Sequence, residues 1–212
     1  MDTIITRDVS IPRLGFGTFR MPGGGCQPVV ESALALGYRH LDTAAMYENE
    51  DAVGAAIATS NVPRGELFVT TKVWHDQLGT ADSIRLAFDT SVEKLKLDYV
   101  DLYMVHWPSK DMNMAIVMET LTALRDEGRA RAIGLCNFNL PMLRQAIDEI
   151  HAPVASLQVV CDLCLRWITS RSAHQTSMSC PSKSCFALDT ASPSSRQTSG
   201  SNPIKCPSRT TV

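Results

Sequence analysis

A β-branched run, LFVTTKVW at residues 67–74, precedes an amphipathic stretch and then a second apolar run, YVDLYMVHW at residues 99–107. In the stretch between the runs, over residues 81–95, apolar side chains recur at helical spacing: Ile84, Phe88, Val92 and Leu95. A strand, a helix and a further strand in this order are typical of a βα unit in a parallel sheet.

The same alternation continues in both directions along the chain. We expect six strands in all, at residues 13–20, 39–43, 67–74, 99–107, 131–136 and 154–159. We expect helices between them, at residues 28–36, 50–58, 81–95, 114–127 and 142–150. Residues 3–11 favour a small hairpin before the first strand, and Gly23 to Gly25 favour a turn into the first helix. Six βα units permit either an open doubly wound sheet or a barrel, and the pattern alone does not choose between them.

The composition is that of a soluble globular protein with one substantial domain, since 44% of the 212 residues are hydrophobic and 20% are charged. A net charge of -2, without a basic stripe in the first 160 residues, argues against a nucleic-acid partner. Residues 1–7 lack the apolar core of a secretory signal, and no stretch is long enough to cross a bilayer. We therefore expect a cytoplasmic protein with no membrane contact.

The character of the sequence changes abruptly after residue 160. Residues 161–212 contain twelve Ser, six Thr and five Cys but only two acidic residues, without a sustained apolar period. Such a segment cannot bury enough apolar surface to offset the entropy lost on ordering it. We expect a barrel domain at 1–160 and a mostly disordered tail at 161–212. A shifted reading frame or a mis-spliced end explains the change better than an ordinary flexible tail, because the change directly follows a well-formed strand.

The tail cysteines raise a separate possibility, a zinc or redox site. Cys161 and Cys164 have the spacing of half a zinc site, but no convincing second pair accompanies them. The two cysteines outside the tail, Cys26 and Cys136, are expected to be free thiols in a reducing compartment. We therefore expect no bound metal.

Four polar residues lie at or just after the ends of predicted strands, where barrel enzymes place their chemistry: Asp42, Tyr47, Lys72 and His106. Each has an ordinary alternative, respectively a cap, a surface aromatic, a lysine reaching to solvent and a hydrogen-bonded core histidine. Lys72 is the most informative of them, because an unpaired ammonium inside an apolar strand is costly. It requires an acidic partner, and Asp42 is the natural candidate.

Together these residues would support reduction of a carbonyl. A phenol has an ordinary pKa near 10, so Tyr47 is a poor proton donor at neutral pH unless nearby positive charge favours the phenolate. Lys72 would supply that charge, Asp42 would hold the lysine, and a neutral His106 would orient the substrate oxygen by a hydrogen bond. Hydride must come from a cofactor, since no side chain supplies it.

A glycine-rich run at residues 15–20, GFGTFR, invites comparison with the dinucleotide-binding fingerprint of doubly wound folds. The match is only partial, because Arg20 stands where the third glycine belongs. The run is therefore weak support for a Rossmann domain.

Five segments resemble the successive signatures of the aldo-keto reductase superfamily, in the same order and at the same spacing. They are LGFGTFR (14–20), GYRHLDTAAMYENEDAVGAAI (37–57), VPRGELFVTTKVW (62–74), LKLDYVDLYMVHWP (95–108) and IGLCNF (133–138). The likeness is greatest to bacterial 2,5-diketo-D-gluconate reductases and their methylglyoxal-reducing relatives, and it covers about the first 160 residues.

The resemblance implies an α/β fold of the TIM (β/α)8-barrel type, here incomplete with about six βα units. It implies a monomeric, NADPH-dependent enzyme that reduces small aldehydes, ketones or keto sugars. The family's catalytic tetrad maps onto Asp42, Tyr47, Lys72 and His106, with Tyr47 as the general acid in reduction. Implied cofactor contacts are Gly17, Thr18, Asp42, Cys136, Asn137 and Gln158. Implied substrate contacts are Phe19, Tyr47, Trp74, His106 and Trp107, of which the two tryptophans have barrel-core packing as the alternative.

The sequence departs from the family pattern in two places. Cys136 stands where the family has a serine, and a thiol is a weaker hydrogen-bond donor than a hydroxyl. Beyond residue 160, the family's last two βα units, its nicotinamide-stacking aromatic and its 2'-phosphate loop have no recognisable counterpart. Six strands would then leave two open sheet edges. The alternative function is therefore a non-catalytic barrel remnant that binds nucleotide weakly or not at all.

Overall fold

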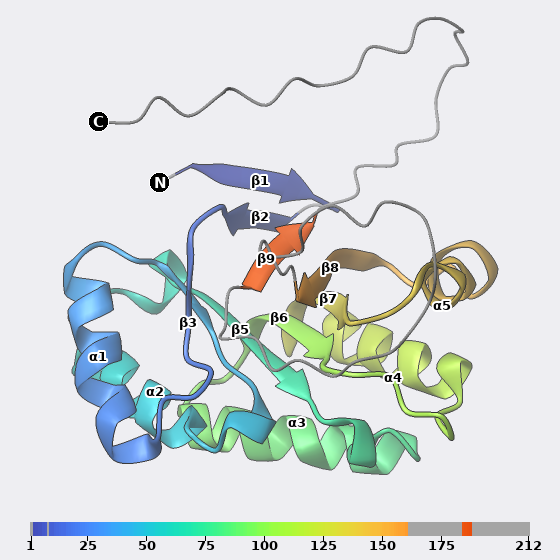
Figure 1. The fold of residues 1–212 in the computed structure, drawn as a ribbon, viewed down its shortest axis with the longest axis horizontal. Coiled ribbons are helices and arrows are strands. Elements are labelled where there is room, and N and C mark those ends of the chain that lie inside the picture. The colour runs from blue at the N-terminus through green and yellow to red at the C-terminus, as the bar shows by residue number, and fades with distance from the viewer. Residues whose placement is uncertain (1, 8, 161–183, 188–212) are drawn as a thin grey trace, which may run out of the picture.

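The computed structural model describes residues 2–7, 9–160 and 184–187, in which a parallel sheet curls into a half-barrel with helices along its outer face (Figure 1). The six parallel strands are β3 (Gly15–Gly17), β4 (His40–Asp42), β5 (Phe68–Val73), β6 (Val100–Val105), β7 (Ala130–Cys136) and β8 (Val154–Val160). Their order across the sheet follows their order in the chain. A doubly wound sheet would reverse its order at a switch point, so the barrel alternative is confirmed.

The helices occupy the positions expected between the strands, with small shifts. They are α1 (Gly23–Ala35), α2 (Glu50–Thr59), α3 (Ala81–Leu95), α4 (Met114–Asp126) and α5 (Leu140–Arg144), the last continuing as a π-helical turn, η4 (Gln145–Glu149). Three 3-10 turns follow or precede strands: η1 (Ala45–Tyr47), η2 (Arg64–Glu66) and η3 (His75–Gln77).

The start of α1 corrects one sequence-based expectation. The run Gly23 to Gly25 forms the first helical turn rather than a lead-in, and the backbone N–H groups of Gly25 and Cys26 both donate to the carbonyl of Pro22. Pro28, expected at the first helical position, therefore lies inside the helix.

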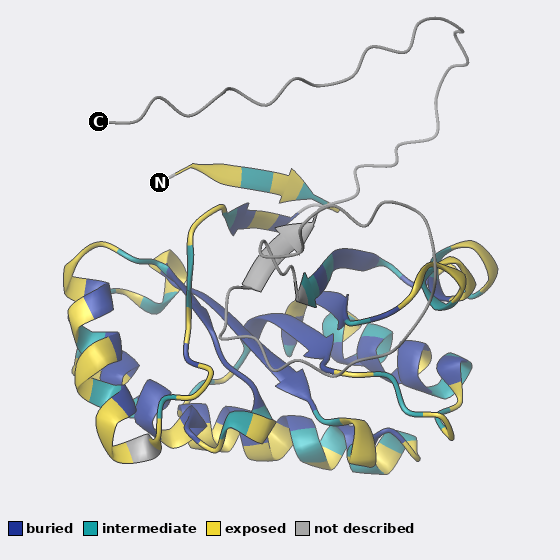
Figure 2. Ribbon diagram, viewed as in Figure 1, coloured by how far each residue is buried: buried dark blue, intermediate teal, exposed yellow. Residues whose placement is uncertain are grey.

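A hairpin of β1 (Thr3–Thr6) and β2 (Val9–Pro12) lies over the concave side of the sheet, opposite the helices (Figure 1). Val9 and Ile11 of β2 are buried in an inner cluster with apolar side chains of the sheet, among them Phe68 and Met104. The hydroxyl of Thr6 also donates to the carbonyl of Ala155 at 3.0 Å. Only one side of β2 is thus buried against the barrel interior, whereas β1 is exposed or half-buried along its length (Figure 2).

Over most of β5, β6 and β7, neighbouring side chains alternate between this inner cluster and a larger outer core against the helices. On β5, Val69 and Val73 belong to the outer core, whereas Phe68 belongs to the inner cluster. Lys72 lies an even number of residues from Phe68 and therefore faces the barrel interior. The strand pattern, buried on both faces, is what a parallel sheet requires.

A short strand from the expected tail, β9 (Ser184–Ala187), pairs antiparallel with β8, with Leu157 opposite Ala187. Strand β8 is therefore paired on both sides, and within the described residues the sheet still ends at two edge strands, β3 and β9, as expected for an incomplete barrel. The predicted disorder of the rest of residues 161–212, and the possible zinc pair Cys161 and Cys164, lie outside the described residues. In the described part of the chain, no helix has both the length and the apolar character that crossing a bilayer requires.

Candidate active site

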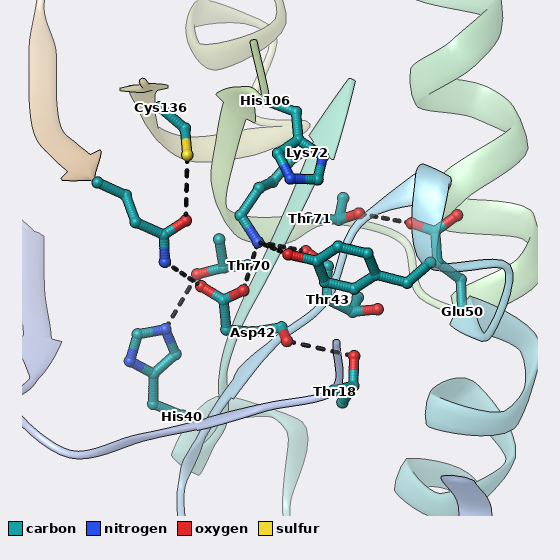
Figure 3. Close-up of polar contacts among 12 residues, drawn as sticks. Thr18, His40, Asp42, Thr43, Glu50, Thr70, Thr71, Lys72, His106 and Cys136 are labelled. Carbon is teal, nitrogen blue, oxygen red and sulfur yellow. Dashed lines mark hydrogen bonds and ion pairs between the residues drawn. The ribbon is translucent and has the colours of Figure 1, made fainter. Parts of the chain in front are cut away.

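Lys72 is the centre of a polar cluster at the carboxyl ends of β4 and β5 (Figure 3). Its side chain is fully buried, and its ammonium forms an ion pair with Asp42 Oδ1. The same Nζ donates to the carbonyl of Thr43 at 2.9 Å and lies 3.4 Å from Tyr47 Oη. An ammonium has three hydrogens to donate, so these three contacts use all of them. The partner expected for the buried charge is therefore in place.

Tyr47 reaches this cluster from η1, the single 3-10 turn that follows β4. The turn closes at Glu48, whose φ of 55° is in the left-handed region. Burial has the largest effect on the pKa of Tyr47 and raises it above the ordinary value, while Lys72 acts to lower it. Lys72 thus lowers the pKa of Tyr47, as expected. The net shift of this pKa is upward, however, which corrects the sequence-based expectation of a more acidic phenol. Tyr47 is a neutral phenol at physiological pH.

His106 directly follows β6 and lies edge-on to two aromatic rings, with ring centroids 5.3 Å from Tyr47 and 5.1 Å from Trp74. Burial, and then repulsion from Lys72, lowers its pKa to about 4, so the imidazole is neutral at pH 7. Its Nδ1 is buried and has no hydrogen-bond partner among the described residues. Such an atom is costly unless something else satisfies it.

The second oxygen of Asp42 faces a group of amide and thiol side chains from β7 and β8. Gln158 Nε2 donates to Asp42 Oδ2 at 2.8 Å, and the thiol of Cys136 lies 3.6 Å from Gln158 Oε1. Asn137, in the left-handed region, donates to the carbonyl of His106 at 3.0 Å and contacts Cys136 Sγ at 3.1 Å. Burial raises the pKa of Cys136 to about 12, so it is a protonated thiol and not a thiolate.

The end of β3 and the loop after it contain the two remaining residues expected to contact a cofactor. Gly17 ends the strand and is exposed. Thr18 is buried, and both its backbone N–H and its hydroxyl donate to the carbonyl of Asp42, at 3.0 and 3.3 Å. Its side chain therefore holds β3 against β4 rather than facing a cavity.

Aromatic side chains surround the outer side of Tyr47 and His106. The ring of Phe19 lies 5.1 Å from that of Tyr47 and is 40% exposed. Trp74 and Trp107 line an open cavity of about 470 Å³ together with polar residues of the loop after β6. The five residues expected to contact substrate thus lie on one side of the cluster, and the two tryptophans face a cavity instead of the barrel core.

Two buried residues near Tyr47 were not predicted from the sequence. Asn49, which is fully buried, bonds to the loop after β3, and Glu50 accepts hydrogen bonds from Thr71 and Ser91 at 2.5 and 3.2 Å. The available signal was their position immediately before an apolar helical pattern. That position indicates ordinary helix capping, so it did not mark them as part of the site.

Comparison with known proteins places this cluster in context. The sequence profile of the aldo/keto reductase family matches residues 13–179. The chain is 43% identical over 146 residues to the methylglyoxal reductase DkgB of Escherichia coli O157:H7, covering 68% of this chain and 54% of the relative. It is 44% identical over 141 residues to an aldo-keto reductase of Mycolicibacterium smegmatis, covering 66% and 51%. The chain spans about half the length of these relatives.

Solved structures give the same result. A crystal structure of an aldo/keto reductase from Brucella melitensis superimposes with a TM-score of 0.71 at 40% identity, over 74% of this chain and 62% of that chain. A putative 2,5-diketo-D-gluconic acid reductase B gives a TM-score of 0.72 at 43% identity, over 75% and 56%. Because the family profile covers more than half of the chain and the fold agrees, the protein belongs to the aldo/keto reductase family.

Proposed function

We propose that the protein reduces the carbonyl group of small aldehydes, ketones or keto sugars to an alcohol, with NADPH as the hydride donor. The observation that supports this most directly is the buried Lys72, whose ammonium contacts both a carboxylate and the phenol of Tyr47. A structural role alone would not place a phenol on a fully buried, fully bonded ammonium, since burying a charge is expensive.

Tyr47 would donate the proton to the carbonyl oxygen. The neutral phenol holds that proton at physiological pH, and the adjacent ammonium stabilises the phenolate that remains after transfer. Attraction to Asp42 raises the pKa of Lys72 against the opposing effect of burial, so the lysine stays charged. Asp42 therefore serves Tyr47 indirectly, by keeping the charge in place.

His106 would orient the substrate. Because its pKa is about 4, its imidazole is neutral at pH 7 and can donate one ring N–H to the carbonyl oxygen without itself acting as a strong acid. Phe19, Trp74 and Trp107 would enclose the rest of the substrate, with the cavity beside the tryptophans leaving space for it.

The residues present fit a nicotinamide cofactor. A carboxamide has one carbonyl and one NH2 group, and the cluster of Asn137, Gln158 and Cys136 offers both donors and acceptors beside Asp42. NADPH, when bound, supplies the hydride that no side chain provides. Gly17 and Thr18 would contribute from the end of β3, and Thr18 would act indirectly, since both its backbone N–H and its hydroxyl bond to the carbonyl of Asp42.

The proposal is tested by following NADPH oxidation by the purified chain with methylglyoxal and with a 2,5-diketo sugar acid, and by repeating the assay with NADH. The matched variant is Tyr47→Phe, which keeps the ring and removes the hydroxyl. We expect it to lose at least about a hundredfold in kcat, as removal of a general acid does, while NADPH affinity stays within about twofold. A folded chain without turnover would support the alternative, a non-catalytic barrel, which NADPH binding by fluorescence would then characterise.

A further inference from the structure

Asn49 occupies the N-cap position of α2 but does not cap the helix. An asparagine at this position ordinarily accepts a hydrogen bond from a backbone N–H of the first turn. Asn113 does so at the start of α4, where its Oδ1 accepts from Ala115 and Ile116, at 3.0 and 3.3 Å. The side chain of Asn49 instead points away from its helix, with φ −136° and ψ 12°.

The amide of Asn49 connects three chain segments. Its Nδ2 donates to the carbonyls of Thr18 and Met21, both at 2.9 Å, in the loop after β3. Its Oδ1 accepts from the hydroxyl of Thr43 at 3.0 Å, just after β4, and lies 3.4 Å from the hydroxyl of Thr18, whose single hydrogen is shared with the carbonyl of Asp42. A side-chain amide has two donor hydrogens and two acceptor lone pairs, so both hydrogens are used and Oδ1 has at least one full hydrogen bond, from Thr43. The residue is also fully buried.

Each of these segments contributes to the candidate active site. The loop after β3 contains Phe19, whose ring packs on Tyr47. Thr43 offers its carbonyl to Lys72 Nζ. Tyr47 itself is two residues before Asn49, and only Glu48, in a left-handed conformation, separates them. The turn of Tyr47 is therefore attached to β4 at one end and, through Asn49, to the neighbouring loop at the other.

The helix that follows has its own anchor. Glu50, the first residue of α2, is 1% exposed and accepts hydrogen bonds from Thr71 on β5 and Ser91 on α3. Four N–H groups at a helix start need partners, and Asn49 provides none of them through its side chain. Its bonds thus serve the turn of Tyr47 and not the helix.

We propose that Asn49 is a positioning residue that fixes the turn of Tyr47, and thereby holds the phenol beside Lys72 and against Phe19. The inference rests on the proposed function in that it names what keeps the proton donor in place. Without the amide, the turn stays attached to β4 and to the anchored start of α2 but loses its bonds to the loop after β3, so the phenol spends less time within reach of the ammonium and of Phe19.

Kinetics provide the first test, with Asn49→Ala as the variant and Asn113→Ala as its matched control. Both variants remove an asparagine side chain at a helix start, so both should lower Tm. Only Asn49→Ala should lower kcat, by about 10- to 100-fold, as displacement of a reacting group by about 1 Å does, with KM for NADPH changed less than about twofold. In the pH profile of alcohol oxidation, the pKa assigned to Tyr47 should be higher in Asn49→Ala than in the wild type, because the phenolate lies farther from Lys72. Equal kcat and equal pH profiles in the two variants would overturn the proposal.

A second test needs no activity. In protein with ring-labelled tyrosine, the NMR signal of Tyr47 is identified by its loss in Tyr47→Phe. Asn49→Ala should shift or broaden this signal, whereas Asn113→Ala should not. If the wild-type chain has no turnover but this shift occurs, the proposed function fails and the positioning role stands. If the wild type is active and the signal does not move, the positioning role fails.

Thr43→Val covers the case in which Asn49→Ala does not fold. This change removes the hydroxyl that bonds to Asn49 Oδ1 and keeps the Thr43 backbone carbonyl that Lys72 contacts. It should shift the Tyr47 signal in the same direction by a smaller amount. An unmoved signal in folded Thr43→Val would count against the proposal.

Discussion

Replacing Lys72 by methionine removes the positive charge beside Tyr47 while keeping a long apolar side chain. The ammonium nitrogen lies 3.4 Å from the phenol oxygen. With an effective dielectric constant of about 20, attraction between an ammonium and a phenolate at this separation is about 5 kcal/mol. If about half of that charge develops in the transition state, the barrier rises by about 2.5 kcal/mol, which corresponds to roughly a hundredfold loss in kcat.

Stability must be separated from this effect. Asp42 is 4% exposed, and Lys72→Met would leave its carboxylate buried without a counter-ion. Breaking one side of a buried ion pair costs about 3–5 kcal/mol, which is a large share of the stability of an ordinary domain. The double variant Asp42→Asn with Lys72→Met removes both charges, so it should recover most of the loss in unfolding free energy and none of the loss in kcat.

The assay is steady-state reduction of methylglyoxal at saturating NADPH, alongside urea unfolding of each variant. The two quantities should diverge: unfolding free energy close to wild type in the double variant, and kcat still about a hundredfold lower. A folded double variant with kcat within about threefold of wild type would refute the reasoning, because the charge next to Tyr47 would then be irrelevant to the chemistry.

Two further predictions follow from neighbouring residues. Cys136→Ser should leave kcat equal or higher, since a hydroxyl is a stronger donor to Gln158 Oε1 than the thiol that lies 3.6 Å from it; a clear fall in kcat would contradict this account of the site. His106 has a pKa of about 4 in the folded protein and 6.5 as its ordinary value, so between these pH values the unfolded chain binds a proton that the folded chain does not. Unfolding free energy should therefore fall as pH is lowered from 6.5 to 4, by at most about 3 kcal/mol from this residue. His106→Gln should have a shallower dependence than wild type in urea unfolding across that window, and an unchanged slope would show that the histidine is not kept neutral by burial.

The sequence predicted the element order well because each βα unit has its own local pattern. The helix at residues 81–95 was placed without error, since its apolar spacing is regular, and the structure adds a capping box of Thr80 and Ser83 at its start. The start of α1 was misplaced, because Pro28 is typical of a helix start and three glycines are typical of a turn. Tertiary context overrode both preferences, with the carbonyl of Pro22 accepting the first helical hydrogen bonds.

In the site, the pairing of Lys72 with Asp42 was predictable from cost alone, because a charge in an apolar strand needs a counter-charge wherever the chain folds. The direction of the pKa shift of Tyr47 was not predictable. It depends on whether the effect of burial exceeds that of Lys72, and burial is a property of the folded molecule. The role of Asn49 could not be predicted from the sequence either. Its position in the sequence is that of a cap, and only the loop after β3, brought alongside by the sheet, gives its amide other partners.

Asp42 shows why the contacts of the site are difficult to predict from the sequence. Its Oδ1 accepts from Lys72, 30 residues along the chain, and its Oδ2 accepts from Gln158, 116 residues along. Its backbone carbonyl accepts from Thr18, 24 residues before it. One residue at the end of β4 thus joins β3, β5 and β8, and it can do so only because parallel strands end at one rim of the barrel. Residue types and their spacing identify which residues belong to the site. That one oxygen of Asp42 bonds to Lys72 and the other to Gln158 depends on the curvature of the sheet, which brings β8 close to β4.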